Sequence, residues 1–412
     1  MTDFKSLALS VKEDVVRWRH DFHEHPELSF KEVETTQKIA AILREIGYEQ
    51  IQTGIPRVPE IGVVADLNPG KPGRCIALRA DMDALPVSEE TGLPYASKNK
   101  NVMHACGHDA HIAMLLGAAK VLFQLRDQIN GNVRLIFQPS EEYVLSEECR
   151  KSGARLIVEE GSAMDGVDAI FALHVWGTLP TGVICYTPGP FMTTNLIVDM
   201  KVKGVGGHGA MPQDCIDPVI AACQIISAWQ TIISREVAPQ DTAVLSVGGI
   251  NVEGAAYNII PESVSVLAGV RTYSEELIGQ IESRMKEMAE GIAHAMRAEI
   301  SFSTLRGVPP VINDEEFTEN AVCAICQSVG PEHMQRIKPV MPSEDFSWYQ
   351  KLVPGAIMFL GVGDETKGTN YAQHHPKFNS DDDALPVGVA GLAAVAYHFL
   401  AGETENNGGE SR

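Results

Sequence analysis

The sequence predicts an α/β fold, with a mostly parallel central sheet flanked by helices and an inserted ferredoxin-like α+β domain. First, short apolar runs alternate with helical patterns up to residue 188, which is typical of a parallel sheet. Second, the order of elements changes between residues 189 and 305 to β-α-β-β-α-β, the ferredoxin-like order. Third, helix–strand alternation resumes after residue 305, so the second module interrupts the first.

The main domain begins with two helices and continues with buried strands. Helices are expected over 13–25, where Pro26 stops the pattern, and over 32–46, where Gly47 ends it. A long helix is expected over 110–125. The expected strands cover 61–66, 75–79, 133–138 and 169–174. In such a sheet, functional side chains gather at the carboxyl ends of the strands.

The inserted domain is expected to contain four strands and two helices. The strands cover 196–202, 242–248, 263–270 and 299–305, and the helices cover 217–235 and 274–296. The main domain is therefore expected to comprise 1–188 and 306–401, with a further buried strand over 356–360, and the inserted domain 189–305. The polar segment 402–412 is expected to be disordered.

Composition excludes several classes of partner. The chain has 33 Lys and Arg against 54 Asp and Glu, a net charge of −21, which argues against nucleic acid as a partner. No apolar run of membrane-spanning length and no secretory signal is recognised, so we expect a cytoplasmic protein with no membrane partner. The eight cysteines are scattered, which disfavours disulfides. For Cys323 and Cys326 we expect a buried structural role.

The densest group of candidate metal ligands precedes the long helix. Cys106 and His108 flank a single glycine, which lets the chain turn tightly so that both side chains can reach one ion. A thiolate and an imidazole suit zinc, with manganese, nickel or cobalt as alternatives. The positive end of the following helix favours the thiolate. A buried cysteine followed by a helix-capping Asp109 is the alternative interpretation, and this segment alone leaves both open.

Two adjacent carboxylates, Glu141 and Glu142, follow an apolar strand that stops at Pro139. Adjacent acids in a loop are usually only solvated. At the end of a buried strand, however, one can bind a metal while its neighbour transfers a proton.

Three further segments carry weaker signals. His174 ends an apolar strand, where a hydrogen-bonded core histidine is the better interpretation if the segment is taken alone. His374 and His375 form a pair far along the chain. Asp83 follows another strand and could accept a hydrogen bond from a metal-binding imidazole, which would fix its tautomer. Together, the segments favour a metal site over separate structural roles.

Several motifs, in order, resemble those of the aminoacylase/carboxypeptidase family of two-metal metallohydrolases. They include Arg79-Ala-Asp-Met-Asp-Ala-Leu-Pro86, His104-Ala-Cys-Gly-His-Asp-Ala-His111, Gln138-Pro-Ser-Glu-Glu142, His174-Val-Trp-Gly177 and Ser343-Glu-Asp-Phe346. The chain is most similar to the branch of hippurate hydrolases and indoleacetyl-amino-acid (auxin-conjugate) hydrolases. The resemblance runs from Arg19 to Phe378. It implies a catalytic domain that binds two divalent ions, zinc or manganese before nickel or cobalt, and an inserted lid domain that often forms the dimer interface.

The resemblance also implies a role for each candidate residue. The implied metal ligands are Cys106, His108, Glu142, His174 and, from the branch's His-x-Pro pattern, His374 rather than His375. Glu141 matches the general base that activates a metal-bound water and then protonates the leaving amine. Asp83 matches the family's orienting aspartate. Elsewhere in the family a ligating histidine stands where this chain has Asp81.

In the inserted domain, His208 matches a histidine that reaches the substrate, often in a neighbouring subunit's site, and would stabilise the oxyanion. Without that match, a loop histidine is the favoured interpretation. Asn258 and Arg271 are weaker candidates for binding a substrate carboxylate, and for Arg271 a surface ion pair is the alternative. A homodimer, or a dimer-based tetramer, is expected through this domain. The segment 143–153 is longer and more charged than the Gly-rich loop of relatives, so no relative's substrate is transferred.

The sequence therefore predicts metal-dependent hydrolysis of the amide bond of a small N-acyl amino acid of the hippurate, N-acetyl or indoleacetyl kind. A di- or carboxypeptidase acting on short peptides by the same mechanism is the alternative. A catalytically inactive, metal-binding regulatory protein is less favoured because Glu141 is present. A structural protein that binds no metal is the third possibility.

Overall fold

The structure is a computed structural model that describes residues 2–142 and 151–401. The tail expected at 402–412 and residues 143–150 of the unusual loop lie outside the described residues. The chain divides into two compact units. The first comprises Met1–Gly189, Ile312–Lys338 and Trp348–Arg412, and the second Pro190–Val311 and Pro339–Ser347. The segment Pro339–Ser347, which the sequence assigned to the main domain, packs with the second unit.

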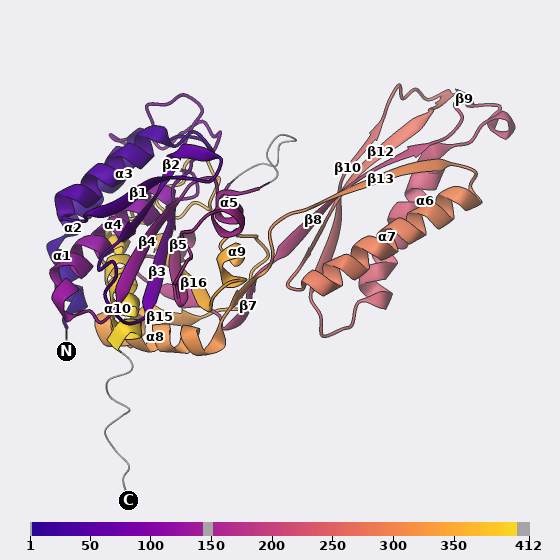
Figure 1. The fold of residues 1–412 in the computed structure, drawn as a ribbon. Helices are drawn as coiled ribbons and strands as arrows, with labels where there is room; N and C mark the ends of the chain where they lie inside the picture. The colour runs from indigo at the N-terminus through magenta and orange to yellow at the C-terminus, as the bar shows by residue number, and fades with distance from the viewer. Residues whose placement is uncertain (1, 143–150, 402–412) are drawn as a thin grey trace, which may run out of the picture. The chain divides into compact units, whose positions relative to one another are not determined.

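An eight-stranded sheet forms the centre of the first unit, in the order β1-β2-β4-β3-β5-β16-β6-β15 (Figure 1). Its strands are β1 (Gln50–Ile55), β2 (Val58–Asp66), β3 (Cys75–Asp81), β4 (Asn132–Gln138), β5 (Ala169–Pro180), β6 (Ile184–Tyr186), β15 (Met334–Arg336) and β16 (Gly355–Gly363). The central strands β4, β3, β5 and β16 run parallel. Antiparallel pairing is confined to β1–β2, β2–β4 and β16–β6. The sheet is therefore parallel at its centre and mixed towards its edges.

Helices cover this sheet. They are α1 (Phe4–Ser10), α2 (Lys12–Glu24), α3 (Val33–Ile46), α4 (His108–Gln124), α5 (Gly153–Glu160), α8 (Glu315–Val329) and α10 (Leu385–Ala401). Helices α4 and α10 pack against each other and against β3 and β5. Their buried apolar residues belong to one continuous core. Helix α3 ends at Gly47, as expected, and the φ of 119° there is a left-handed conformation that glycine adopts without strain.

One segment of the first unit resembles a membrane span by length and composition. It is Asp382–Ala401, but 72% of its most apolar stretch is buried inside the protein. Because α10 contacts α4, α8 and α1, its apolar surface is accounted for by packing within the unit. The sequence was expected to lack an apolar run of this length. The structure corrects that expectation and identifies the run as a core helix.

The second unit contains a four-stranded antiparallel sheet in the order β10-β12-β8-β13. Its elements follow the expected β-α-β-β-α-β order: β8 (Thr194–Lys203), α6 (Pro218–Thr231), β10 (Ala243–Val252), β12 (Ser263–Thr272), α7 (Glu275–Ala295) and β13 (Glu299–Arg306). Alternate residues of β8 and β12 are buried under α6 and α7. The indole Nε1 of Trp229 donates to the carbonyl oxygen of Met285 at 2.9 Å, which joins the two helices.

Three local expectations differ from the structure. Strand β5 continues to Pro180, so His174 lies within the strand rather than at its end. Helix α6 passes into a π-helical turn at Ile232–Glu236. Cys323 is exposed and Cys326 half-buried, so the expected burial of this pair is wrong for Cys323. The described cysteines are all free.

Candidate metal centre

The tight turn expected between Cys106 and His108 is present and requires glycine. Gly107 has φ 89°, and a Cβ there would lie 2.2 Å from Cγ2 of Val175 on β5. The turn leads into α4 with both Cys106 and His108 buried. Asp109 does not cap this helix. Its carboxylate Oδ2 accepts from the guanidinium Nε of Arg19 at 3.1 Å and contacts Nδ1 of His23 at 2.9 Å. The capping alternative is therefore wrong.

Asp83 organises the turn that carries the two glutamates. Its Oδ1 accepts from the backbone N–H of Glu141 and its Oδ2 from that of Glu142, both at 3.1 Å. The hydroxyl of Ser29 donates to Oδ2 at 2.6 Å. Oδ1 also lies 3.3 Å from Nδ1 of His108. One buried carboxylate thus links the Glu141–Glu142 turn to the His108 ring.

The tautomer of His174 follows from its contacts. Its Nδ1 lies 2.7 Å from the carbonyl oxygen of Val175, which can only accept, so Nδ1 is the donor. The other ring nitrogen, Nε2, lies 3.6 Å from Sγ of Cys106. The lone pair of Nε2 is therefore directed towards the thiol, as a metal ligand requires.

Of the two paired histidines, His374 joins the cluster. Its Nε2 lies 2.9 Å from Oε1 of Glu142. Its backbone N–H donates to the carbonyl oxygen of Ala105 at 2.7 Å, and its φ is 66°. Nδ1 of His375 instead accepts from the backbone N–H of Lys377 at 3.0 Å. The geometry thus distinguishes two neighbours that sequence alone separated only by resemblance.

The donor atoms suit two neighbouring ions. Cys106, His108 and His174 have ligand atoms within 4.8 Å of one another, as do Cys106, Glu142 and His374. Cys106 belongs to both groups, so one sulfur could serve two ions. Nδ1 of the buried His108 lies 3.3 Å from Oδ1 of Asp83, and its Nε2 makes no hydrogen bond to any described residue. A buried imidazole with a ring nitrogen left over, beside a thiol and a carboxylate, fits a divalent cation.

The electrostatics agree with that fit. Burial, with the charges of Glu142 and Glu141, raises the pKa of the Cys106 thiol well above its ordinary value. These effects outweigh the lowering of the thiol pKa that the start of α4 was expected to cause. Burial alone would lower the pKa of His108, but the charges of Asp81 and Asp83 raise it to about 10. Burial lowers the pKa of His174 to about 4. A cation would favour the thiolate here and displace the His108 proton.

The candidates in the second unit lie on or next to two short segments and on β12. His208 in β9 (Gly207–His208) pairs with Ile259 in β11 (Ile259–Ile260), beside Asn258. Nδ1 of His208 accepts from the backbone N–H of Ala210 at 3.1 Å, so in the neutral ring Nε2 carries the proton. Arg271 donates through Nη1 to the carbonyl oxygen of Met341 and to Oγ of Ser343, at 3.0 and 3.1 Å. Its guanidinium therefore also holds the Pro339–Ser347 segment.

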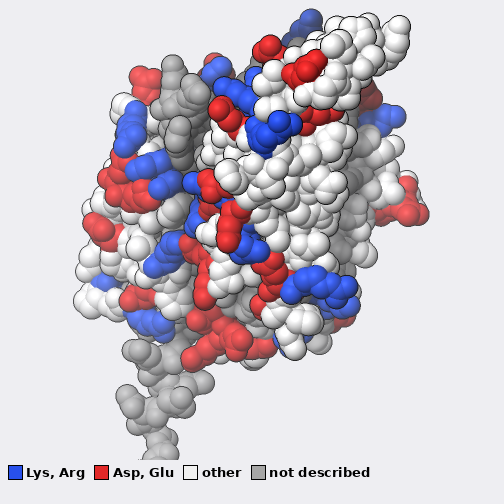
Figure 2. Space-filling model, turned by 90° about the vertical axis from the view of Figure 1, so that its right-hand side faces the viewer, with Lys and Arg blue, Asp and Glu red and all other residues white. Residues whose placement is uncertain are grey.

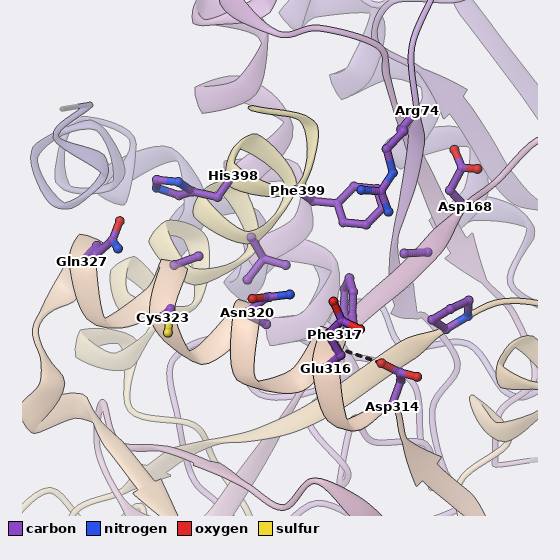
Figure 3. A pocket seen from close by; sticks show the side chains of 15 residues that line it. Arg74, Asp168, Asp314, Glu316, Phe317, Asn320, Cys323, Gln327, His398 and Phe399 are labelled. Atoms are coloured by element: carbon purple, nitrogen blue, oxygen red, sulfur yellow. Dashed lines mark hydrogen bonds between the residues drawn. The ribbon is translucent and has the colours of Figure 1, made fainter. Parts of the chain in front are cut away.

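A different pocket of the first unit has no candidate residue in its lining. It is bounded by Arg74, Asp168 and Pro354, which immediately precede β3, β5 and β16, and by α8 and the end of α10 (Figure 3). Its volume is about 520 Å³. Arg74 stacks on the ring of Phe399, 3.7 Å from its centroid. Because it opens at the amino ends of these strands, this pocket is separate from the candidate metal centre.

On the face that Figure 2 shows, basic side chains are interspersed with acidic ones. The whole chain carries a formal net charge of −21.

Comparison with known proteins identifies the family. Residues 77–398 match the model of Peptidase family M20/M25/M40. The chain belongs to this family. N-acetylcysteine deacetylase of Bacillus subtilis (strain 168) is 40% identical over 94% of this chain and 97% of that protein. An IAA-amino acid hydrolase of Arabidopsis thaliana is 37% identical over 96% of this chain and 88% of that protein.

A solved structure supports the same assignment. It is a Bacillus subtilis protein described as a dinuclear metal binding peptidase of this family, with a TM-score of 0.80, 35% identity and coverage of 95% of this chain and 99% of that one. The relatives confirm the expected family, the α/β fold and an enzyme that hydrolyses amides. This chain is thus a hydrolase with the metal-binding fold of its family.

Sequence reasoning missed two buried groups near the cluster. One is His111, which stands one helical turn after His108, a spacing that signals a shared helix face. The other is Glu32, whose Oε1 accepts from the backbone N–H of Ser140 at 2.8 Å and so supports the turn before Glu141. No local pattern marks Glu32, because its partner lies 108 residues away.

Proposed function

We propose that this enzyme hydrolyses the amide bond of small N-acyl amino acids in a metal-dependent reaction. The observation that carries the proposal is the convergence of a thiol, three imidazoles and a carboxylate, contributed by Cys106, His108, His174, His374 and Glu142. Next to this ligand set stands a second carboxylate, Glu141, whose backbone is fixed on Asp83. A ligand set with a spare acid is what metal-assisted hydrolysis needs.

In the proposed site those five residues hold two divalent ions, with zinc or manganese favoured. Such ions, when bound, polarise the amide carbonyl and make water acidic enough to lose a proton near neutral pH. Asp83 keeps the His108 ring oriented from 3.3 Å. His174 stays in the Nε2-binding tautomer through its contact with the carbonyl oxygen of Val175 at 2.7 Å.

Glu141 is the proposed proton carrier. Its carboxylate takes a proton from the attacking water as the new carbon–oxygen bond forms, and then delivers it to the amide nitrogen as the carbon–nitrogen bond breaks. The products are a carboxylic acid and a free amino acid. Glu142 cannot share this role while it binds metal, which explains why two adjacent acids are needed.

Roles in substrate binding are proposed for three residues of the second unit. Nε2–H of His208 makes no hydrogen bond to any described residue and is free to donate to the developing oxyanion. Asn258 and the remaining guanidinium nitrogens of Arg271 are candidates to bind the substrate carboxylate. The amide-cleaving relatives include an N-acetylcysteine deacetylase and a thermostable carboxypeptidase of Saccharolobus solfataricus, so a peptide substrate is the competing proposal.

A substrate panel tests the proposal. N-acetyl, N-benzoyl and indoleacetyl amino acids are assayed beside dipeptides with the metal-loaded enzyme. We expect hydrolysis of at least one N-acyl class at a higher kcat/KM than any dipeptide. Hydrolysis of dipeptides alone would replace the deacylase proposal with the peptidase one.

We also propose that the second unit joins two copies of the chain. The face of its sheet turned away from α6 and α7 exposes Val244, Leu267 and Ile197, each at least 37% accessible. Contiguous exposed apolar surface marks protein–protein interfaces, and these three side chains contribute apolar surface to the uncovered face of the sheet. Light scattering should give twice the 44.7 kDa chain mass, and a monomer would contradict the proposal. A cytoplasmic location stays a prediction.

A further inference from the structure

A buried chain of hydrogen bonds joins the segments that carry the candidate ligands. Oδ1 of Asp81, the last residue of β3, lies 2.5 Å from Nδ1 of His111 on α4. Nε2 of His111 accepts from the backbone N–H of Val175 on β5 at 2.7 Å. Arg79 donates through Nη1 to Oδ2 of Asp81 at 2.8 Å. The side chains of Asp81, His111 and Arg79 are at most 2% exposed.

The contacts of His111 determine its tautomer. A backbone N–H can only donate, so Nε2 of His111 is the acceptor and, in the neutral ring, Nδ1 carries the proton. That proton is donated to Asp81. Both ring nitrogens are therefore used, and neither has a lone pair left for an ion.

The carboxylate oxygens of Asp81 are likewise both occupied by hydrogen bonds. Its two oxygens receive hydrogen bonds from His111 and Arg79, and the guanidinium balances its charge. By distance alone, Asp81, His108 and His111 could form another metal-binding group, with ligand atoms within 4.8 Å of one another. The hydrogen bonds argue against that use, because an ion would have to displace both of them.

The same network reaches the strand that leads to the two glutamates. Nε of Arg79 donates to Oε1 of Gln138 at 2.9 Å, and the hydroxyl of Tyr349 donates to the same oxygen at 3.1 Å. Gln138 ends β4, three residues before Glu141. Four segments are thus tied together: the end of β3 with Asp83, the start of α4 with His108, β5 with His174, and the end of β4.

We propose that Asp81 and His111 are positioning residues that hold these four segments in register, and that they are not ligands of a further ion. The inference rests on the proposed metal-dependent function. It predicts that breaking the network weakens metal binding while the number of ions bound at saturation stays the same. Groups that orient metal ligands typically change metal affinity about 10–100-fold.

Two conservative substitutions of His111 test its two hydrogen bonds separately. In His111→Asn the amide nitrogen can replace Nδ1 and keep the bond to Asp81, but the acceptor for Val175 is lost. In His111→Gln the amide oxygen can replace Nε2 and keep the bond from Val175, but the donor to Asp81 is lost. His111→Ala loses both. We expect metal affinity to fall in all three variants, most in His111→Ala.

The measurement is the dissociation constant and stoichiometry of zinc and of cobalt, by titration of the chelator-stripped full chain, with thermal unfolding to confirm folding. Cobalt absorption reports whether the thiolate of Cys106 still binds. Unchanged affinity in folded His111→Gln and His111→Asn would overturn the inference. So would a loss of one ion per chain at saturating metal, because it would make His111 a ligand. If the wild-type chain binds no metal, the proposed function itself fails, which is a distinguishable result.

A second pair of variants, each lacking one buried hydroxyl, disturbs folding less than the substitutions of His111. Tyr349→Phe removes one hydroxyl from the far end of the network. Tyr48→Phe removes a comparable buried hydroxyl that donates to the carbonyl oxygen of Ala119, also in the first unit but outside the network. We expect Tyr349→Phe to weaken metal binding more than Tyr48→Phe. Equal losses of metal affinity in the two variants would show that the hydrogen-bond network does not influence the metal centre.

Discussion

At the level of single residues, two neighbouring acids, Glu141 and Glu142, have different tasks in the proposed reaction. Replacing Glu141 with Gln keeps its size and backbone bond to Asp83 but removes the proton acceptor. We expect kcat to fall about 10²–10⁴-fold, with metal content unchanged. Glu60→Gln, at an exposed position of β2, serves as the control and should leave kcat unchanged. Loss of metal in Glu141→Gln would instead make Glu141 a ligand.

His23 provides a pH-dependent test of the buried support around Asp109. Burial lowers the pKa of His23, but the charge and hydrogen bond of Asp109 outweigh it and raise the pKa to about 8 from 6.5. Because the folded-state pKa is the higher one, the stabilisation is complete below about pH 6.5 and is lost as pH rises through 8. A shift of this size is worth about 2 kcal/mol.

We therefore expect the free energy of unfolding to decline between about pH 6.5 and 8 by an amount that His23→Asn lacks. Denaturant unfolding of the metal-free chain at several pH values measures this difference. His25→Asn, at a half-exposed position one residue beyond α2, is the control. Identical pH profiles for the wild type and His23→Asn would contradict the assignment.

Among the secondary-structure elements, the start of α4 at the Cys106–His108 turn leaves no room for a side chain on Gly107. Gly107→Ala adds a methyl group at φ 89° and 2.2 Å from Val175. The left-handed conformation alone costs about 1–2 kcal/mol for a residue with a side chain. Gly70→Ala is the matched control, because its φ is 75° but nothing lies within 4 Å of its Cβ.

We expect Gly107→Ala to lower both the melting temperature and the metal affinity more than Gly70→Ala does. The extra loss measures the clash with β5, since both positions have a left-handed backbone. If the two variants behave alike, the close approach of the turn to Val175 is not important for the site.

The elements themselves were largely predictable. The periodicity of apolar residues located α2, α3, α4, α7 and most of the longer strands to within a few residues, because these segments bury one face or both. The edge strand β1 and the short strands β6 and β15 were not predicted, and β5 extends six residues beyond its expected end. The contacts that complete the site were not predictable locally. His374 meets Glu142 from 232 positions away, and Asp109 is bound by Arg19 across 90 positions rather than capping its own helix. Such pairings arise from tertiary packing, which leaves no periodic signal.

At the scale of the whole molecule, the two compact units carry different parts of the proposed chemistry. The candidate ligands and Glu141 belong to the first unit, whereas His208, Asn258 and Arg271 belong to the second. We expect His208→Ala to lower kcat and to leave metal content unchanged, because its ring would act on the oxyanion and not on the ions. Parallel loss of metal in this variant would contradict that division of roles.

We propose that amide hydrolysis by this chain depends on two divalent ions held around Cys106. The most direct measurement is turnover of the best N-acyl amino acid substrate while chelator-stripped enzyme is titrated with zinc or manganese. We expect negligible turnover without metal, and a rise in turnover that saturates at two ions per chain. Full turnover by the metal-free protein would contradict this proposal, as would turnover that reaches its maximum although no ions are bound.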